Sequence, residues 1–143
     1  MSFGASASDL IVCIQLAHKI WRGCRDAPDD FRIVSTEVAG LQLVLKEVQE
    51  TVNDRELGQS KKDDLKMLLE GCSSVLDELK KLLQRYKSLG TQSKRTWDRL
   101  RWGKEQIESI RQRIIANTSL LTSFNVGLVG YVRHEDPDRW VAY

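Results

Sequence analysis

The sequence has few residues of the kinds that build chemical sites or interrupt helices. Its 143 residues include two histidines, three cysteines and two prolines. His18 and His134 lie at opposite ends of the chain, and neither has Cys, Asp or Glu at metal-ligand spacing on a shared helix face. A glycine-rich phosphate loop, a dinucleotide-binding fingerprint and a Gly-x-Ser-x-Gly elbow are all absent. We therefore expect no enzyme activity, no cofactor and no metal site.

The sequence also lacks an excess of one charge and a long apolar run. Lys and Arg number 22 against 20 Asp and Glu, a net charge of +2 that is too even to indicate nucleic-acid binding. No apolar run approaches the ~18 residues of a transmembrane helix. Cys13, Cys24 and Cys72 form no CxxC pair, and no signal-peptide pattern follows Met1. We expect a cytoplasmic protein whose reduced thiols lie in its core.

Apolar residues recur at steps of three and four along most of the chain, which predicts α-helices. We expect helices at about residues 7–24, 28–52, 60–89 and 93–131. The last three carry continuous apolar seams. The seam of 28–52 begins with Phe31, Val34, Val38, Leu41 and Leu45, and that of 60–89 with Leu65, Leu68, Cys72, Val75 and Leu79. The seam of 93–131 includes Leu100, Ile107, Ile110, Ile114 and Leu121.

Four such helices predict an all-α, antiparallel four-helix bundle over residues 1–131. We expect the first helix to be buried in the space between the others. The last helix is long, and Gly103 and Asn117 weaken its stripe enough to allow a kink or break near either residue. Residues 132–143 show no stripe and are expected to form a tail or the start of a linker. Periodicity alone leaves a second arrangement open, in which the seams at 31–52 and 65–89 form coiled coils between chains.

The first helix is apolar around most of its circumference. Its polar residues at 15, 18, 19 and 22 follow one narrow stripe. Such a helix must be buried, either permanently in the bundle or until it leaves the bundle for a membrane or a partner. The candidate effector residues on this helix are Phe3, Leu10, Ile11, Ile14, Ile20 and Trp21.

A second candidate site is a basic and aromatic stretch at the start of the fourth helix. It can be a solvated face with tryptophan rings stacked on cations, or a contact for anionic lipid or a protein partner. Its residues are Lys94, Arg95, Trp97, Arg99, Arg101, Trp102 and Lys104.

Several segments together resemble a known family. They are the start at 2–9, the turn at 25–31, the segments 69–72 and 86–90, and the densest one, Trp97-Asp98-Arg99-Leu100-Arg101-Trp102-Gly103. Over about residues 2–130 the chain resembles the N-terminal HeLo-like helical domain of fungal STAND receptors, which are NLR-like proteins. That domain is related in architecture to HeLo domains and to the coiled-coil domains of plant NLR immune receptors.

The resemblance implies a signalling or effector domain that precedes a nucleotide-binding domain and repeats. It implies self-association on activation, followed by regulated cell death of the kind seen in innate immunity and heterokaryon incompatibility. Release of an N-terminal helix toward the plasma membrane would trigger that death, and on this chain the helix is residues 3–21. Two alternatives stay open: an interaction or homo-oligomerisation module without membrane activity, and a structural bundle with no activity of its own.

Overall fold

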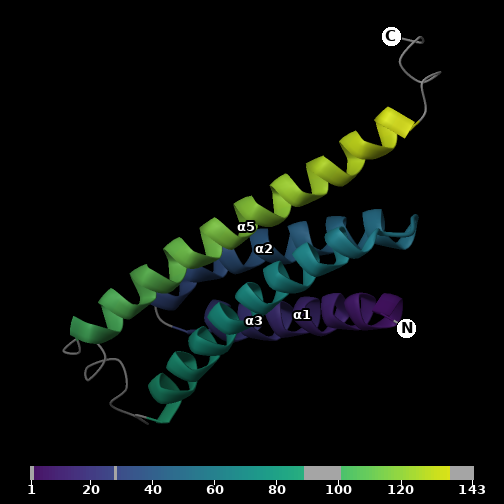
Figure 1. Cartoon of the computed structure of the whole chain (residues 1–143). Helices are drawn as coiled ribbons and strands as arrows, with labels where there is room; N and C mark the ends of the chain where they lie inside the picture. The colour runs from purple at the N-terminus through teal and green to yellow at the C-terminus, as the bar shows by residue number, and fades with distance from the viewer. Residues whose placement is uncertain (1, 28, 89–100, 136–143) are drawn as a thin grey trace.

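The computed structural model describes residues 2–27, 29–88 and 101–135, and the side chains within 7–27, 30–88 and 103–130. This part of the chain is all-α and forms four helices (Figure 1). They are α1 (Ser2–Arg25), α2 (Asp29–Asn53), α3 (Gln59–Ser88) and α5 (Arg101–Glu135). Successive helices run in opposite directions, so the predicted antiparallel four-helix bundle is confirmed.

The seams read from the sequence line one shared core. All seven α2 residues from Phe31 to Val52 that repeat at steps of three and four are buried. On α3 and α5 the same spacing supplies the remaining wall of the core. The seams therefore pack within one chain and are not left free for a coiled coil between chains. The buried seam residues of α3 and α5 are Leu65, Leu69, Cys72, Val75, Leu76, Leu79, Leu82, Leu83, Ile107, Ile110, Ile114, Leu121, Phe124 and Leu128.

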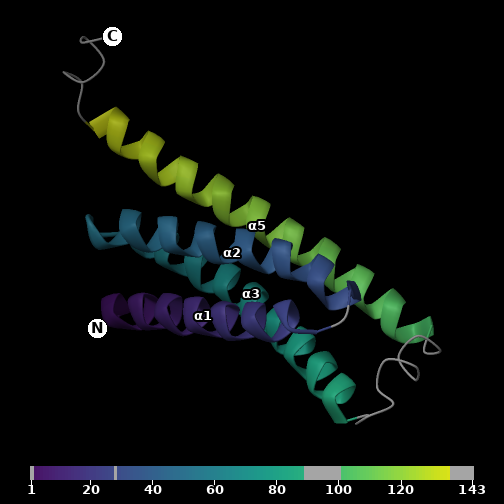
Figure 2. The same cartoon turned by 180° about the vertical axis from the view of Figure 1, so that it is seen from behind.

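The first helix lies at one side of the bundle. Figures 1 and 2 show α1 and α5 on opposite sides, with α2 and α3 between them, and each middle helix contacts both outer ones. This arrangement corrects the expectation that the first helix fills the space between the other three. A helix with two neighbours on one side can bury only the face that they share, so Ile11 and Val12 remain 44% and 60% exposed.

The α1 helix extends further than expected at both ends. It begins at Ser2 instead of near residue 7, and it continues through Gly23 to Arg25. Gly23 serves packing and does not end the helix. A Cβ atom placed on Gly23 would lie 2.6 Å from Cδ2 of Leu83. The missing side chain therefore lets α1 approach α3 closely at this point.

The α5 helix passes Asn117 without a break. The Asn117 side chain faces Gly71 of α3, and its Oδ1 lies 3.2 Å from the position that a Gly71 Cβ would occupy. The space left by this glycine accommodates the polar side chain, so no kink is needed. Gly103 lies within the first turn of α5, and the helix includes residues 132–135 that we expected in the tail. Residues 93–100 of the expected helix and residues 136–143 lie outside the described part of the chain.

Candidate functional site

The buried face of α1 is a row of small and medium apolar side chains at helical spacing. Leu10 and Ile20 are 0% and 2% exposed, and Cys13, Ala17 and Cys24 between and beyond them are also buried. Ile14, Leu16 and Trp21 are half-buried and pack against this row.

The six candidate effector residues therefore fall into separate groups. Leu10 and Ile20 are core residues, Ile14 and Trp21 flank the core, and Ile11 lies on the outer face. The side chain of Phe3 lies outside the described residues. Trp21 also contacts two side chains of its own helix, because Arg25 Cζ lies 4.9 Å from the centre of its ring and the His18 ring lies 5.8 Å away.

The outer face of α1 carries the polar stripe that the sequence indicates. Gln15, His18, Lys19 and Arg22 are all exposed. This face is wider than the sequence pattern suggested, because Ile11 and Val12 are exposed as well. The helix is amphipathic in the fold, with one face in the core and the opposite face in solvent.

Apolar packing holds α1 in place. Along residues 7–25 no described side chain forms an ion pair with another helix, and Arg25 pairs only with its neighbour Asp26. The polar contacts of this helix with α3 are made by sulfur. Ser73 Oγ lies 3.9 Å from Cys13 Sγ, and the Cys13 and Cys72 thiols share a hydrogen bond.

The three cysteines are buried and free. Burial raises the pKa of Cys24 to about 12. The pKa of Cys72 is also raised, first by its hydrogen bond with Cys13 and then by burial. The Cys24 and Cys72 thiols are therefore uncharged at neutral pH. Burial of all three cysteines agrees with the prediction that they pack as small apolar side chains.

The opposite helix, α5, is held differently. Arg111 of α5 donates two hydrogen bonds to Glu37 Oε1 of α2, at 3.1 Å from Nε and 2.8 Å from Nη2. A second ion pair joins Arg113 to Glu78 of α3. Near its C-terminal end, the α5 carbonyl oxygen of Leu128 accepts a hydrogen bond of 2.9 Å from Arg55. These directional contacts fix α5 along its length, whereas the described residues of α1 are held by packing and by the hydrogen bonds of Cys13, with no ion pair to another helix.

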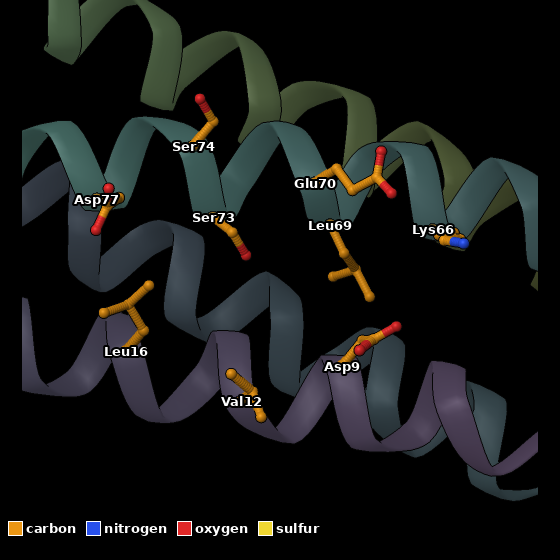
Figure 3. Close-up of a pocket in the computed structure, with 9 residues that line it drawn as sticks. All are labelled: Asp9, Val12, Leu16, Lys66, Leu69, Glu70, Ser73, Ser74 and Asp77. Atoms are coloured by element: carbon orange, nitrogen blue, oxygen red, sulfur yellow. The ribbon is translucent and has the colours of Figure 1, made fainter.

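A groove of about 600 Å³ opens between α1 and α3 (Figure 3). Apolar side chains from both helices line it: Val12 and Leu16 from α1, and Leu69 from α3. Val12 is 60% exposed and Leu69 is buried, so the groove offers an apolar surface that solvent reaches.

Charged and hydroxyl side chains surround this apolar surface. Asp9 of α1 and Glu70 and Asp77 of α3 contribute three carboxylates, against one amine from Lys66. Asp77 pairs along its own helix with Lys81 at 3.1 Å. Ser73 and Ser74 complete the lining. The groove is therefore acidic.

Sequence reasoning did not identify this groove. Asp9 belongs to a helix whose other residues in this region are mostly apolar, so the sequence gives it no partner on another helix. The α3 residues of the groove flank the apolar seam and resemble an ordinary solvated face. Residues 9–16 and 66–77 meet only through the packing of α1 on α3.

The basic candidate stretch is described only in part. Lys94, Arg95, Trp97 and Arg99 lie outside the described residues, as do the side chains of Arg101 and Trp102. Lys104 is exposed in the first turn of α5. The structure therefore places one end of the stretch, on the helix opposite α1.

Two kinds of feature are absent from the described residues. None of their helices has an apolar stretch long enough to cross a membrane. No group of three or more His, Cys, Asp or Glu side chains among them could hold a metal ion.

Comparison with known proteins gives one match. The SesA family model, described as an N-terminal domain on NACHT NTPases and P-loop NTPases, matches residues 6–121. Neither the curated proteins nor the solved structures gave a match. The matched region contains most of α1, all of α2 and α3, and more than half of α5. This chain belongs to the SesA family, the N-terminal domain found on NACHT and other P-loop NTPases.

Proposed function

We propose that this domain is the signalling end of a NACHT-type receptor of the NLR class, in which assembly of the parent protein releases α1 and leads to regulated cell death. The family assignment supports the receptor context, because SesA domains occur on NACHT and P-loop NTPases. The observation that carries the proposal is the contrast between the two outer helices. Ion pairs join α5 to both middle helices, whereas among the described residues no ion pair joins α1 to another helix.

The burial of α1 sets the free energy of its release. Covering Leu10, Ile20 and the three smaller residues between and beyond them stabilises the docked helix by about 6–10 kcal/mol. This value is comparable with the whole stability of an ordinary domain, about 5–15 kcal/mol. A single domain therefore keeps α1 docked. Release requires new burial of the same apolar face, in an assembly or at a membrane.

A released α1 fits a membrane interface better than a membrane-spanning position. Its apolar row contacts acyl chains, while the polar stripe with Lys19 and Arg22 faces the headgroups. The two basic residues favour an anionic surface, such as the inner leaflet of the plasma membrane. We propose that activation recruits the protein to this surface.

A leakage assay tests the membrane step. The domain, clustered by fusion to a trimeric tag, is added to anionic vesicles that contain a dye. We expect clustered protein to release dye and unclustered protein to release little. Ile14→Glu places a charge on the half-buried flank of α1 and should abolish leakage. Val44→Glu is the matched control, since Val44 is half-buried against the same core from α2.

Two results would contradict the membrane step. One is an absence of leakage from the clustered domain. The other is equal leakage from the Ile14→Glu and Val44→Glu variants, provided that circular dichroism shows both to be folded. Expression in fungal cells, with and without residues 2–21, tests the cell-death outcome. Equal growth of both strains argues against it.

The second candidate function is homo-oligomerisation or partner binding without membrane activity. Two observations favour it: the wholly polar stripe on the outer face of α1, and the acidic groove beside that helix. The same assay separates the two functions, because an assembly module forms oligomers and leaves the vesicles intact.

A further inference from the structure

The groove between α1 and α3 is lined by apolar and acidic side chains that have no role in the proposed release of α1. Val12, Leu16 and Leu69 give it an apolar surface, and the carboxylates of Asp9 and Glu70 extend from its two walls (Figure 3). Both acidic residues are exposed. An occupant that fits this groove needs apolar side chains together with positive charge.

The same chain contains a segment of that chemistry. Residues 94–104 carry five Lys or Arg residues, one Asp and two tryptophans in eleven positions. Tryptophan and arginine are the residues that most often dominate the binding free energy of protein interfaces. The segment therefore complements the groove in both charge and apolar character.

The described end of the segment lies away from the groove, which favours docking between two copies of the chain. The segment ends in the first turns of α5, where Lys104 is exposed, and α5 lies on the opposite side of the bundle from α1 (Figures 1 and 2). The groove opens between α1 and α3, whereas this end of the segment belongs to α5, across the bundle from α1.

We propose that the acidic groove between α1 and α3 docks the basic segment 94–104 of a second copy of this chain. The proposal rests on the self-association in the proposed function and names the surfaces that carry it. The contact is heterologous, because two different surfaces meet, so repetition builds a ring or an open head-to-tail filament. Clustering by the parent receptor raises the local concentration of both surfaces, which allows a contact that is weak between free domains to form.

The position of the groove links assembly to α1. One wall of the groove belongs to α1, through Asp9, Val12 and Leu16. A segment docked there contacts the helix whose described residues form no ion pair with another helix. Assembly through this groove therefore acts directly on the element whose release we propose.

Reciprocal charge reversal tests the docking. The groove variant is Asp9→Lys with Glu70→Lys, and the segment variant is Arg95→Glu with Arg99→Glu. The control variant, Glu47→Lys with Glu50→Lys, makes the same change in net charge at exposed positions of α2. Self-association of the 143-residue chain and its variants is measured by sedimentation equilibrium, after circular dichroism has confirmed that each is folded.

We expect the groove and segment variants each to weaken self-association by about tenfold, because rim charge pairs contribute about 0.2–1 kcal/mol each and reversal makes them repulsive. Mixing the two variants should restore association, since opposite charges face each other again. The control variant should associate like the wild-type chain. Added salt should weaken wild-type association.

Several outcomes overturn the docking. The docking is refuted if the groove variant associates as strongly as the wild-type chain. It is also refuted if mixing the groove and segment variants does not restore association. If only the groove variant weakens, another basic surface occupies the groove and the assignment to 94–104 is wrong. A wild-type chain that stays monomeric at high concentration also refutes the docking. In every case the leakage assay on the artificially clustered domain decides the proposed function separately.

Discussion

Truncation of Leu10 to alanine is the sharpest test of how α1 is held. Leu10 is fully buried at the interface of α1 with the middle helices. Leu→Ala substitutions at such sites cost about 2.7–5.0 kcal/mol, the sum of lost apolar transfer and of the cavity that remains. We expect Leu10→Ala to lower the free energy of unfolding by about 3 kcal/mol. Val12→Ala, on the same helix but 60% exposed, should change it by less than about 0.5 kcal/mol.

Hydrogen exchange can show which helices are destabilised by the Leu10→Ala substitution. Because no ion pair ties residues 7–25 to another helix, α1 should open while α2, α3 and α5 remain folded. In the wild-type protein the amides of α1 should then exchange with a lower opening free energy than the amides of α5. Leu10→Ala should accelerate exchange in α1 by about a hundredfold, the equivalent of about 3 kcal/mol.

Two results would refute this reasoning. A loss below about 1 kcal/mol for Leu10→Ala would show that the packing of α1 contributes little. A single opening free energy shared by the amides of α1 and α5, in the wild-type and variant proteins alike, would show that α1 does not open separately. The Val12→Ala protein is the control in both measurements.

Three further predictions concern helix packing, thiol ionisation and the fixation of α5. Gly40→Ala should raise the free energy of unfolding by about 0.5–1 kcal/mol in urea titrations, because nothing lies within 4 Å of the added methyl group. Gly23→Ala should lower it by about 1–3 kcal/mol, because the added methyl group clashes with Leu83 of α3. Burial raises the pKa of Cys24 from 9.0 to about 12, so the unfolded-state thiol ionises first, and its contribution to stability is present below pH 9 and is lost as the pH rises toward 12. Unfolding measured across this range should show a shallower loss for Cys24→Ala than for the wild-type protein, and identical slopes would contradict the pKa shift. Glu37→Ala leaves the Arg111 guanidinium without its partner on α2 and should lower the free energy of unfolding by about 1–2 kcal/mol. The amides of α5 should exchange faster in this variant. Unchanged exchange would show that the ion pair does not fix the helix.

The four helices and their core could be predicted from the sequence because both depend on local spacing. Apolar residues at steps of three and four align on one face of a helix whatever lies opposite, so Phe31, Leu45, Leu79 and Ile114 are core residues in any helical packing of the chain. The helix boundaries depended on more than spacing. Gly23 resembles a stop signal, yet its contact with α3 keeps it inside α1.

The candidate site could be predicted only in part. The sequence identified α1 as the unusual helix and found its polar stripe, since both are properties of one segment. It did not show that Ile11 and Val12 face solvent, because that depends on how many neighbours α1 has. The acidic groove was missed for the same kind of reason: Asp9 and Glu70 are far apart in the chain and meet only across two packed helices.

The sequence by itself determined that this chain forms four helices that share one apolar core, because side-chain periodicity is a local property of the backbone. The tertiary structure alone decided that the seams close within one chain, that α1 lies at the side of the bundle opposite α5, and that ion pairs hold one outer helix while packing holds the other. These features depend on which helix faces meet in space, and local periodicity does not specify that choice. The absence of ion pairs from the described residues of α1 to other helices supports the proposal that α1 is the element released on activation.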